Sequence, residues 1–410
     1  MSPTTIPGNL IIQSPAANDP LLDLNTQPSL DLQFATSKTL DDRVSGQNLI
    51  TFSRSTTGTY VDSNGIIQTA AIDAPRFDHD PTTNASLGLL VEESRENLVT
   101  NSEDLTGWST IFAGDGVNPT VQNISDTAPD GGTTVTEITF QRNTANTSDY
   151  SLYREQYGTT AVSTGSVYVK AARPSDVGKV IDFYHNQGAP IDFNSVTLTD
   201  TWQRVSSVGA GVIAGFLTLG LYSATSSTGQ VKILAWGAQL EEGAFATSYI
   251  PTSGSTVTRA ADVASITGSN FSRWYNQSEG TVFCDAKPDK VFSSGTRPWD
   301  FTYPWPAQTW LAPDGVVFAS AGSGSTSNPA LGLGIPSKTI VGYNAITKQV
   351  SGSAFGIMSS IATGVFDARN VSVMYIGRER TGANYLNSTI ARLTYYPYRL
   401  PDATLQEITS

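Results

Sequence analysis

Apolar and polar residues alternate in short runs along most of the chain, and this pattern predicts β-strands. Leu30, Leu32 and Phe34 are separated by polar residues, as the inward side chains of a half-buried strand are. Between about residues 102 and 243, similar runs recur at sandwich spacing and are separated by Gly, Ser, Thr and Asp. No sustained helical period interrupts them. The pattern therefore predicts an all-β protein of antiparallel β-sandwich or jelly-roll domains in tandem, with few short helices.

Two local signals add detail to this pattern. The Asp-Ser-Asn-Gly sequence at 62–65 lies between two apolar pairs and tolerates positive φ, so we expect a β-hairpin there. Near the C-terminal end, Pro401 suits the first turn of a helix, and Leu405 with Ile408 forms a short apolar stripe. A short terminal helix is therefore expected.

The changes of pattern along the chain predict four regions. Residues 1–29 are polar and proline-spaced, which predicts an extended arm that is either a disordered tail or a segment ordered by a partner. A small β region follows at 30–101 and is interpreted as a docking or connecting part. Residues 102–250 are predicted to form a jelly roll, and residues 251–410 a second β-sandwich.

Composition and charge narrow the function classes. Charged residues make up 15% of the 410 residues and the formal net charge is -12, so no broad basic face is expected for nucleic acid or an anionic membrane. The N-terminal sequence lacks the basic start and long apolar run of a signal peptide or membrane anchor. With Cys284 as the single cysteine, no intrachain disulfide and no thiolate-rich metal site is expected. Cys284 shares a strand face with apolar residues and is interpreted as a core residue.

Several segments together resemble structural proteins of tailed bacteriophages, especially tail-fibre and other appendage subunits with lectin-like jelly rolls. The middle region, with Trp202-Gln203-Arg204-Val205 and a closing Trp236–Gly243 segment, looks like carbohydrate-binding modules. The C-terminal region is similar in outline to laminin-G or concanavalin-like sandwiches. The segments that carry the main resemblance are 51–60, 75–81, 87–98, 236–243, 247–251 and 258–262.

This resemblance implies a component of the virion, assembled in the host cytoplasm, that contacts other virion proteins through its N-terminal region and a host-surface glycan elsewhere. It also implies a homotrimer, because threefold symmetry is common among phage appendages. A capsid or tail connector, or a head-decoration fibre without glycan binding, is the first alternative. A polysaccharide depolymerase is the second. The resemblance transfers no ligand residue, because sugar-contacting loops vary in such families.

The chain offers little for enzymatic chemistry. Its two histidines, His79 and His185, have no G-x-S-x-G nucleophile sequence to pair with, although Asp78 and Asp80 flank His79. The E-x-D-x-x-E pattern of many concanavalin-like hydrolases is absent, as is a Walker lysine sequence. We therefore expect a protein that is not an enzyme and carries no cofactor, with a structural calcium ion left open for the jelly roll.

The densest aromatic segment spans residues 299–310, where Trp and Tyr are interleaved with prolines. Such rings can stack on pyranose faces, whereas core packing or a subunit interface explains them without a ligand. Trp202 and Trp236 lie within predicted strands and are interpreted as structural. The carbohydrate-binding candidates are Trp299, Tyr303, Trp305 and Trp310, together with Trp108 near the start of the jelly roll.

Overall fold

The computed structural model confirms the all-β fold class. It describes residues 27–159, 161–186, 194–209, 212–287, 296–302, 308–311, 316–321, 324–330, 337–354, 356–359, 362–363 and 371–410, so most of the expected arm lies outside the described residues. Within these ranges, antiparallel strands dominate. Helix there is confined to α1 (Phe34–Ser37), α2 (Gly268–Ser272), α3 (Asp402–Thr409) and the 3-10 turn η1 (Pro174–Asp176).

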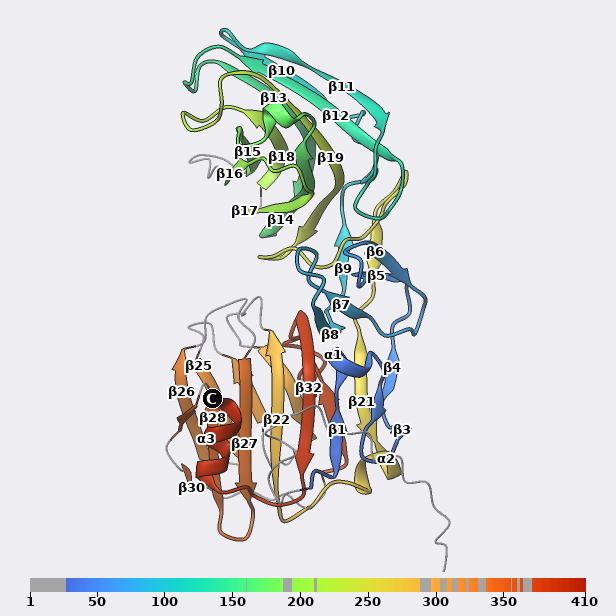
Figure 1. Cartoon of the computed structure of the whole chain (residues 1–410), viewed down its shortest axis with the longest axis vertical. Coiled ribbons are helices and arrows are strands. Elements are labelled where there is room, and N and C mark those ends of the chain that lie inside the picture. Colours follow the sequence, from blue (N-terminus) through green and yellow to red (C-terminus); the bar gives the residue numbers. More distant parts are fainter. Residues whose placement is uncertain are drawn as a thin grey trace, which may run out of the picture.

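The lower half of the molecule in Figure 1 is a sandwich of two sheets. One sheet runs in the order β29 (Ile357–Met358), β28 (Gln349–Ala354), β27 (Ser337–Asn344), β22 (Glu279–Lys287), β32 (Ser388–Tyr396), β1 (Leu30–Leu32), β2 (Asp41–Asp42) and β3 (Gln47–Asn48); β30 (Ala362–Thr363) pairs with β28, and β8 (Ser86–Val91) joins β32 to β7 (Phe77–His79). The second sheet has the strand order β26 (Gly324–Ala330), β25 (Val316–Ala321), β24 (Gln308–Leu311), β23 (Thr296–Phe301), β31 (Val373–Ile376), β21 (Val263–Thr267) and β4 (Thr51–Ser53).

The N-terminal strands complete this sandwich instead of forming a separate connector. In β1, Leu32 is paired with Leu393 of β32, and in β4, Phe52 is paired with Ala264 of β21. Because the apolar side chains of β1 can be buried only against this distant part of the chain, residues 30–53 belong to both sheets of the C-terminal sandwich. This corrects the expected boundary between the 30–101 region and the second sandwich.

The upper half in Figure 1 is the expected jelly roll, again with two antiparallel sheets. The first sheet runs β10 (Ser109–Ala113), β13 (Tyr150–Thr159), β18 (Val212–Leu221), β15 (Val180–Asn186) and β16 (Asn194–Thr197). The second runs β11 (Val117–Ser125), β12 (Thr134–Arg142), β19 (Gly229–Glu242), β14 (Ser163–Ala171) and β17 (Gln203–Gly209). Their inner faces enclose one apolar core.

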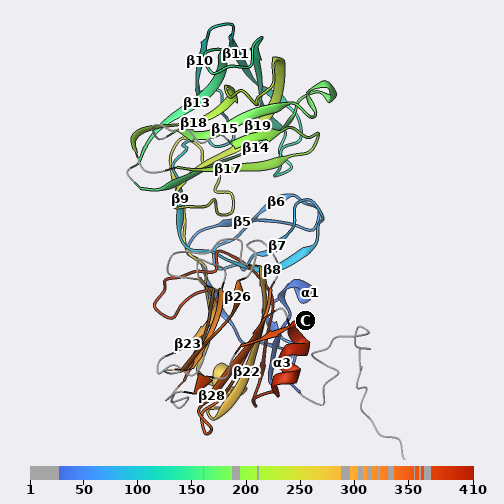
Figure 2. The same cartoon turned by 90° about the vertical axis from the view of Figure 1, so that its left-hand side faces the viewer.

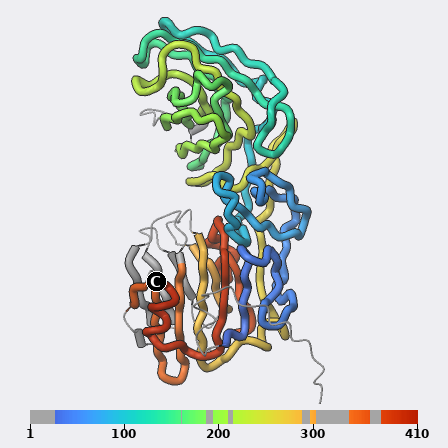
Figure 3. The backbone as a smooth tube through the Cα atoms, viewed as in Figure 1, coloured from blue at the N-terminus to red at the C-terminus, as the bar shows by residue number. Residues whose placement is uncertain are grey.

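Two chain crossings join the halves. β9 (Arg95–Asn97) leads into the jelly roll and β20 (Val257–Arg259) leads out of it, and the two pair antiparallel. Figure 3 shows them as the cyan and yellow segments between the halves. The jelly roll is therefore inserted between strands of the lower sandwich, and the two do not simply follow each other in tandem.

The local predictions agree with the structure. β5 (Gly58–Val61) and β6 (Ile67–Ala70) form the expected hairpin, with Gly65 at φ +77° in its turn. The expected terminal helix α3 lies against the lower sandwich (Figure 2), and its Leu405 and Ile408 are buried there. Cys284 is fully buried in the core. In the described part, no helix has the length and apolar character needed to cross a membrane.

Candidate functional site

Five buried charged side chains form a network at the junction of the two halves, which we call the junction network: Arg54, Arg76, Glu92, Arg259 and Asp262. Each is at most 3% exposed. Asp262 pairs with both Arg54, at 3.0 Å, and Arg76. Glu92 pairs with Arg76 at 2.8 Å and lies 3.5 Å from Arg259. Burial opposes ionisation of Glu92, but Arg259 and Arg76 outweigh it and lower the pKa of Glu92 to about 2.

The junction network accounts for the sequence segments that carry the family resemblance. Segments 51–60 and 75–81 supply its first two arginines, 87–98 supplies Glu92, and 258–262 supplies the remaining pair. Asn97 adds a second tie, because its side chain accepts from the backbone N–H of Leu240 at 3.0 Å and donates to the Ile250 carbonyl at 2.8 Å. These segments therefore build the buried connection between the halves.

The sheet β10-β13-β18-β15-β16 has an inner face toward the jelly-roll core and an outer face, and the strand register shows which side chains lie on each. Tyr153, Leu219 and Phe183 are cross-strand neighbours that point into the jelly-roll core. Because successive side chains of a strand point to opposite faces, the next row, which includes Arg154 and Tyr184, points outward. The outer face of the β10-β13-β18-β15-β16 sheet is thus the one available to a ligand.

Five side chains on this outer side form a surface that we call the aromatic face: Tyr150, Arg154, Tyr184, Phe216 and Tyr222. The Arg154 guanidinium lies 3.9 Å from the ring centroid of Phe216. The Tyr222 ring lies 5.6 Å from Tyr150 and 6.3 Å from Tyr184. All but Tyr184 are half-buried, so each of these side chains packs partly against its neighbours and is partly exposed to solvent. Such a surface offers both apolar contact and charged hydrogen-bond donors.

Two buried charges fix the turn that carries Tyr222. Asp182 accepts from the backbone N–H groups of Tyr222, at 2.9 Å, and Ser223, at 2.7 Å. Arg142 donates to the carbonyl oxygens of Tyr222, at 2.9 Å, and of Ser223 and Ser226, both at 2.6 Å. Burial lowers the pKa of Arg142, and Asp182 opposes that shift. The ring of Tyr222 is therefore presented from a backbone held on both sides.

The tryptophans proposed from sequence lie elsewhere. Trp299 is fully buried in the lower core, 5.4 Å from the Phe301 ring. Trp108 is 8% exposed and stacks on Tyr153 in the jelly-roll core. A covered ring offers no face to a sugar, so core packing explains both tryptophans. Tyr303 and Trp305 lie outside the described residues, and so does the side chain of Trp310, which belongs to β24.

Among the described residues, neither histidine lies beside an exposed nucleophile. His185 Nε2 lies 3.5 Å from the Ser163 hydroxyl, but the two residues are 5% and 0% exposed. Burial lowers the pKa of His185 to about 4. His79 Nδ1 bonds the Val61 carbonyl at 3.0 Å. No substrate can reach the Ser163 hydroxyl in this arrangement.

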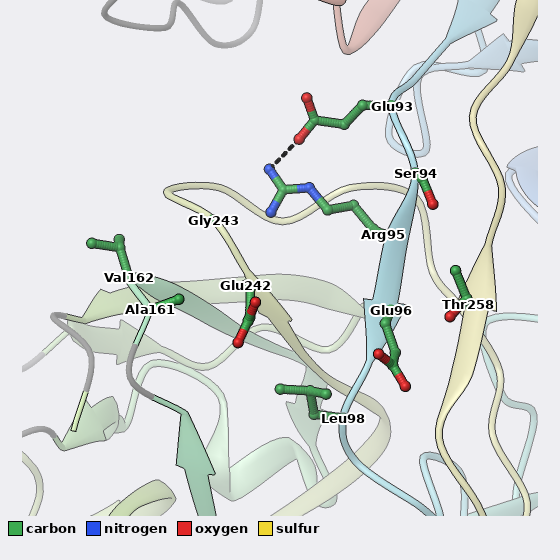
Figure 4. A pocket seen from close by; sticks show the side chains of 10 residues that line it. All are labelled: Glu93, Ser94, Arg95, Glu96, Leu98, Ala161, Val162, Glu242, Gly243 and Thr258. Atoms are coloured by element: carbon green, nitrogen blue, oxygen red, sulfur yellow. Dashed lines mark ion pairs between the residues drawn. The ribbon is translucent and has the colours of Figure 1, made fainter. Parts of the chain in front are cut away.

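A pocket of about 680 Å³ lies beside the first chain crossing and is shown in Figure 4. Its centre is Arg95, whose guanidinium pairs with Glu93 at 2.6 Å. Glu96 and Glu242 also line the pocket, so acidic groups outnumber the one arginine. A Cβ atom on Gly243, whose φ is +128°, would lie 1.7 Å from an Arg95 nitrogen. Arg95 is therefore held in place by local packing, and we assign this pocket no ligand.

Comparisons with known proteins give weak matches. No protein-family model and no curated protein matches the chain. Among solved structures, a carbohydrate-binding module of Ruminococcus gnavus IT-sialidase bound to α2,3-sialyllactose is 16% identical, with a TM-score of 0.28, over 33% of this chain and 84% of that one. A Limulus polyphemus pentraxin is 15% identical, with a TM-score of 0.24, over 32% and 70%. A Trypanosoma rangeli sialidase is 8% identical, with a TM-score of 0.30, over 71% and 62%. Similarity at this level leaves function to be argued from this chain's own residues.

Proposed function

We propose that this protein binds carbohydrate through the aromatic face of its jelly roll. The observation that carries the proposal is the cluster of tyrosines, a phenylalanine and an arginine on the solvent side of one sheet, where Arg154 packs on Phe216 and Tyr222 packs on two further rings. Half-buried rings clustered on the solvent side of a sheet leave apolar area in contact with water, which is typical of a binding surface.

The chemistry of this face suits a sugar. Aromatic rings pack against the C–H faces of pyranoses, while the polar edges of the sugar need hydrogen-bond partners. Arg154 supplies donors, and the exposed side chains of Gln156, Ser195 and Thr197 lie on the same outer face. Because all these groups stand on paired strands, the surface is ordered before a ligand arrives.

A glycan array probed with the intact protein tests this function. We expect binding to a restricted set of glycans, and loss of that binding in Phe216→Ala and Tyr222→Ala. Phe112→Ala is the matched control, since Phe112 is 53% exposed on the edge strand β10 of the same sheet and points away from the aromatic face. Absence of binding by the folded protein, or equal loss in all three variants, would overturn the proposal.

We further propose that the protein is not an enzyme, and the depolymerase alternative is separated by its product. A depolymerase would release reducing ends from host capsule or lipopolysaccharide, whereas a receptor binder would decorate cells without degrading the polymer. We expect decoration without release. Release of reducing ends would favour the depolymerase.

The biological setting we propose is a bacteriophage appendage, a homotrimer that contacts other virion proteins through its N-terminal region. The support is the sequence resemblance of the segments that build the junction network. Immunogold labelling of intact particles should place the protein on a tail fibre with the jelly roll outward. Labelling at the capsid, with no adsorption to cells, would favour the head-decoration alternative, and a monomer mass in light scattering would remove the trimer.

A further inference from the structure

A cleft of about 960 Å³ lies between the two halves, away from the aromatic face. The cleft is lined by the hairpin β5–β6 and strand β7, by residues 199–204 of the jelly roll, and by the first residues of β32. Figure 1 shows the hairpin β5–β6 and strand β7 between the jelly roll and the lower sandwich. A volume of this size accommodates a short oligosaccharide.

Two buried polar groups that line the cleft have no hydrogen-bond partner among the described residues: His79 Nε2 and Thr389 Oγ1. The two residues are 4% and 3% exposed. His79 Nδ1 faces the Val61 carbonyl, which can only accept, so Nδ1 donates this hydrogen bond and Nε2 is the ring nitrogen without a partner among the described residues. Buried polar groups in native proteins are nearly always paired, and a ligand in the cleft that supplies hydroxyl groups would satisfy both of these.

The opposite wall supplies an aromatic ring. Trp202 is half-buried and lines the cleft; its indole N–H donates to the Thr127 carbonyl at 2.9 Å, and its ring packs at the edge of an apolar cluster that contains Ile67 and Tyr249. The Lys170 ammonium lies 4.9 Å from its centroid and also pairs with Asp126. Acidic and basic side chains line the cleft in nearly equal numbers, so its charge selects neither a strongly acidic nor a strongly basic ligand.

We infer that this cleft is a second carbohydrate site, which takes a neutral sugar unit with its hydroxyls on His79 and Thr389 and its ring against Trp202. The cleft extends the proposed carbohydrate binding to another part of the molecule. It shares no residue with the aromatic face, so either site can fail alone.

Fluorine NMR of the full chain labelled with 5-fluorotryptophan tests the cleft. The Trp202 resonance is assigned with Trp202→Phe, and the probes are neutral trisaccharides of glucose, galactose, mannose and N-acetylglucosamine at millimolar concentration. We expect at least one probe to shift this resonance saturably, and Phe216→Ala to leave that shift unchanged. No saturable shift with any probe, while the array ligand still binds the aromatic face, would overturn the cleft site and leave the proposed function standing.

Thr389→Val supplies a second readout, because an unpartnered hydroxyl costs the free protein stability. We expect the variant to melt no lower than the wild type while its affinity for the sugar falls about fivefold to tenfold. Thr136→Val is the matched control, because Thr136 Oγ1 accepts from the Leu105 N–H and donates to Asn123. It should lower the melting temperature and leave the sugar affinity unchanged. A lower melting temperature of Thr389→Val with unchanged affinity would show a structural water at Thr389 and contradict the site.

Discussion

Replacing Asp262 by Asn would remove the carboxylate that two buried guanidinium groups share. Asp262 is fully buried and bonds Arg54 at 3.0 Å, Arg76, and the backbone N–H of Glu92 at 2.9 Å. An amide of the same shape keeps one acceptor but leaves Glu92 as the one carboxylate facing three arginines, so the formal charge of the junction network rises from +1 to +2. Breaking a buried ion pair by removing one partner costs about 3–5 kcal/mol, and we expect Asp262→Asn to fall in this range.

Urea denaturation followed by circular dichroism measures this cost. The matched control is Asp126→Asn, because Asp126 also pairs with one cation, Lys170 at 3.1 Å, but its side chain is 38% exposed. A pair of that kind contributes at most about 1 kcal/mol. If Asp262→Asn lost no more stability than Asp126→Asn, the buried ion pairs of the junction network would not stabilise the fold as we infer.

Three further predictions concern pH and packing. Because the pKa of Glu92 is lowered from 4.5 to about 2, its contribution to stability is complete above pH 4.5 and is lost as the pH falls toward 2. In urea titrations, Glu92→Gln should lack this loss of stability in acid. Burial raises the pKa of Asp78 from 3.8 to about 6, so its contribution to stability is complete below pH 3.8 and is lost as the pH rises through 6. The free energy of unfolding of Asp78→Asn should therefore gain about 1–2 kcal/mol relative to the wild type between pH 4 and 7. A difference between the two proteins that stays constant with pH would contradict this. Leu405→Ala should cost about 2–5 kcal/mol by calorimetry, because Leu405 is fully buried, whereas the exposed Gln406→Ala should cost little.

Strand content was predictable from sequence, but strand partners were not. The alternation at Leu30 and Leu32 predicts a strand, and β1 is there. Its partner β32 lies at the other end of the chain, and nothing local to residue 30 indicates it. Periodicity reports only which faces of a strand are buried, so the insertion of the jelly roll between β9 and β20 required the three-dimensional pairing.

The aromatic face could not be predicted from the sequence for a related reason. The sequence candidates include Trp299, which lies in the core, whereas the outward rings are Tyr150, Phe216 and Tyr222. The alternation of Tyr150 and Arg154 along β13 is visible in the sequence, but which of its two faces is covered depends on the second sheet. The one available signal was Arg154 at an even spacing from Tyr150, since arginine rarely points into an apolar core.

Isothermal titration of the intact protein with the best glycan from the array tests the central claim most directly. The wild type, Phe216→Ala and Phe112→Ala are compared at one pH and salt concentration. Loss of a stacking ring should raise the Kd of Phe216→Ala about tenfold, with the Kd of Phe112→Ala unchanged. An unchanged Kd in Phe216→Ala, or an equal increase in both variants, would contradict carbohydrate binding at the aromatic face.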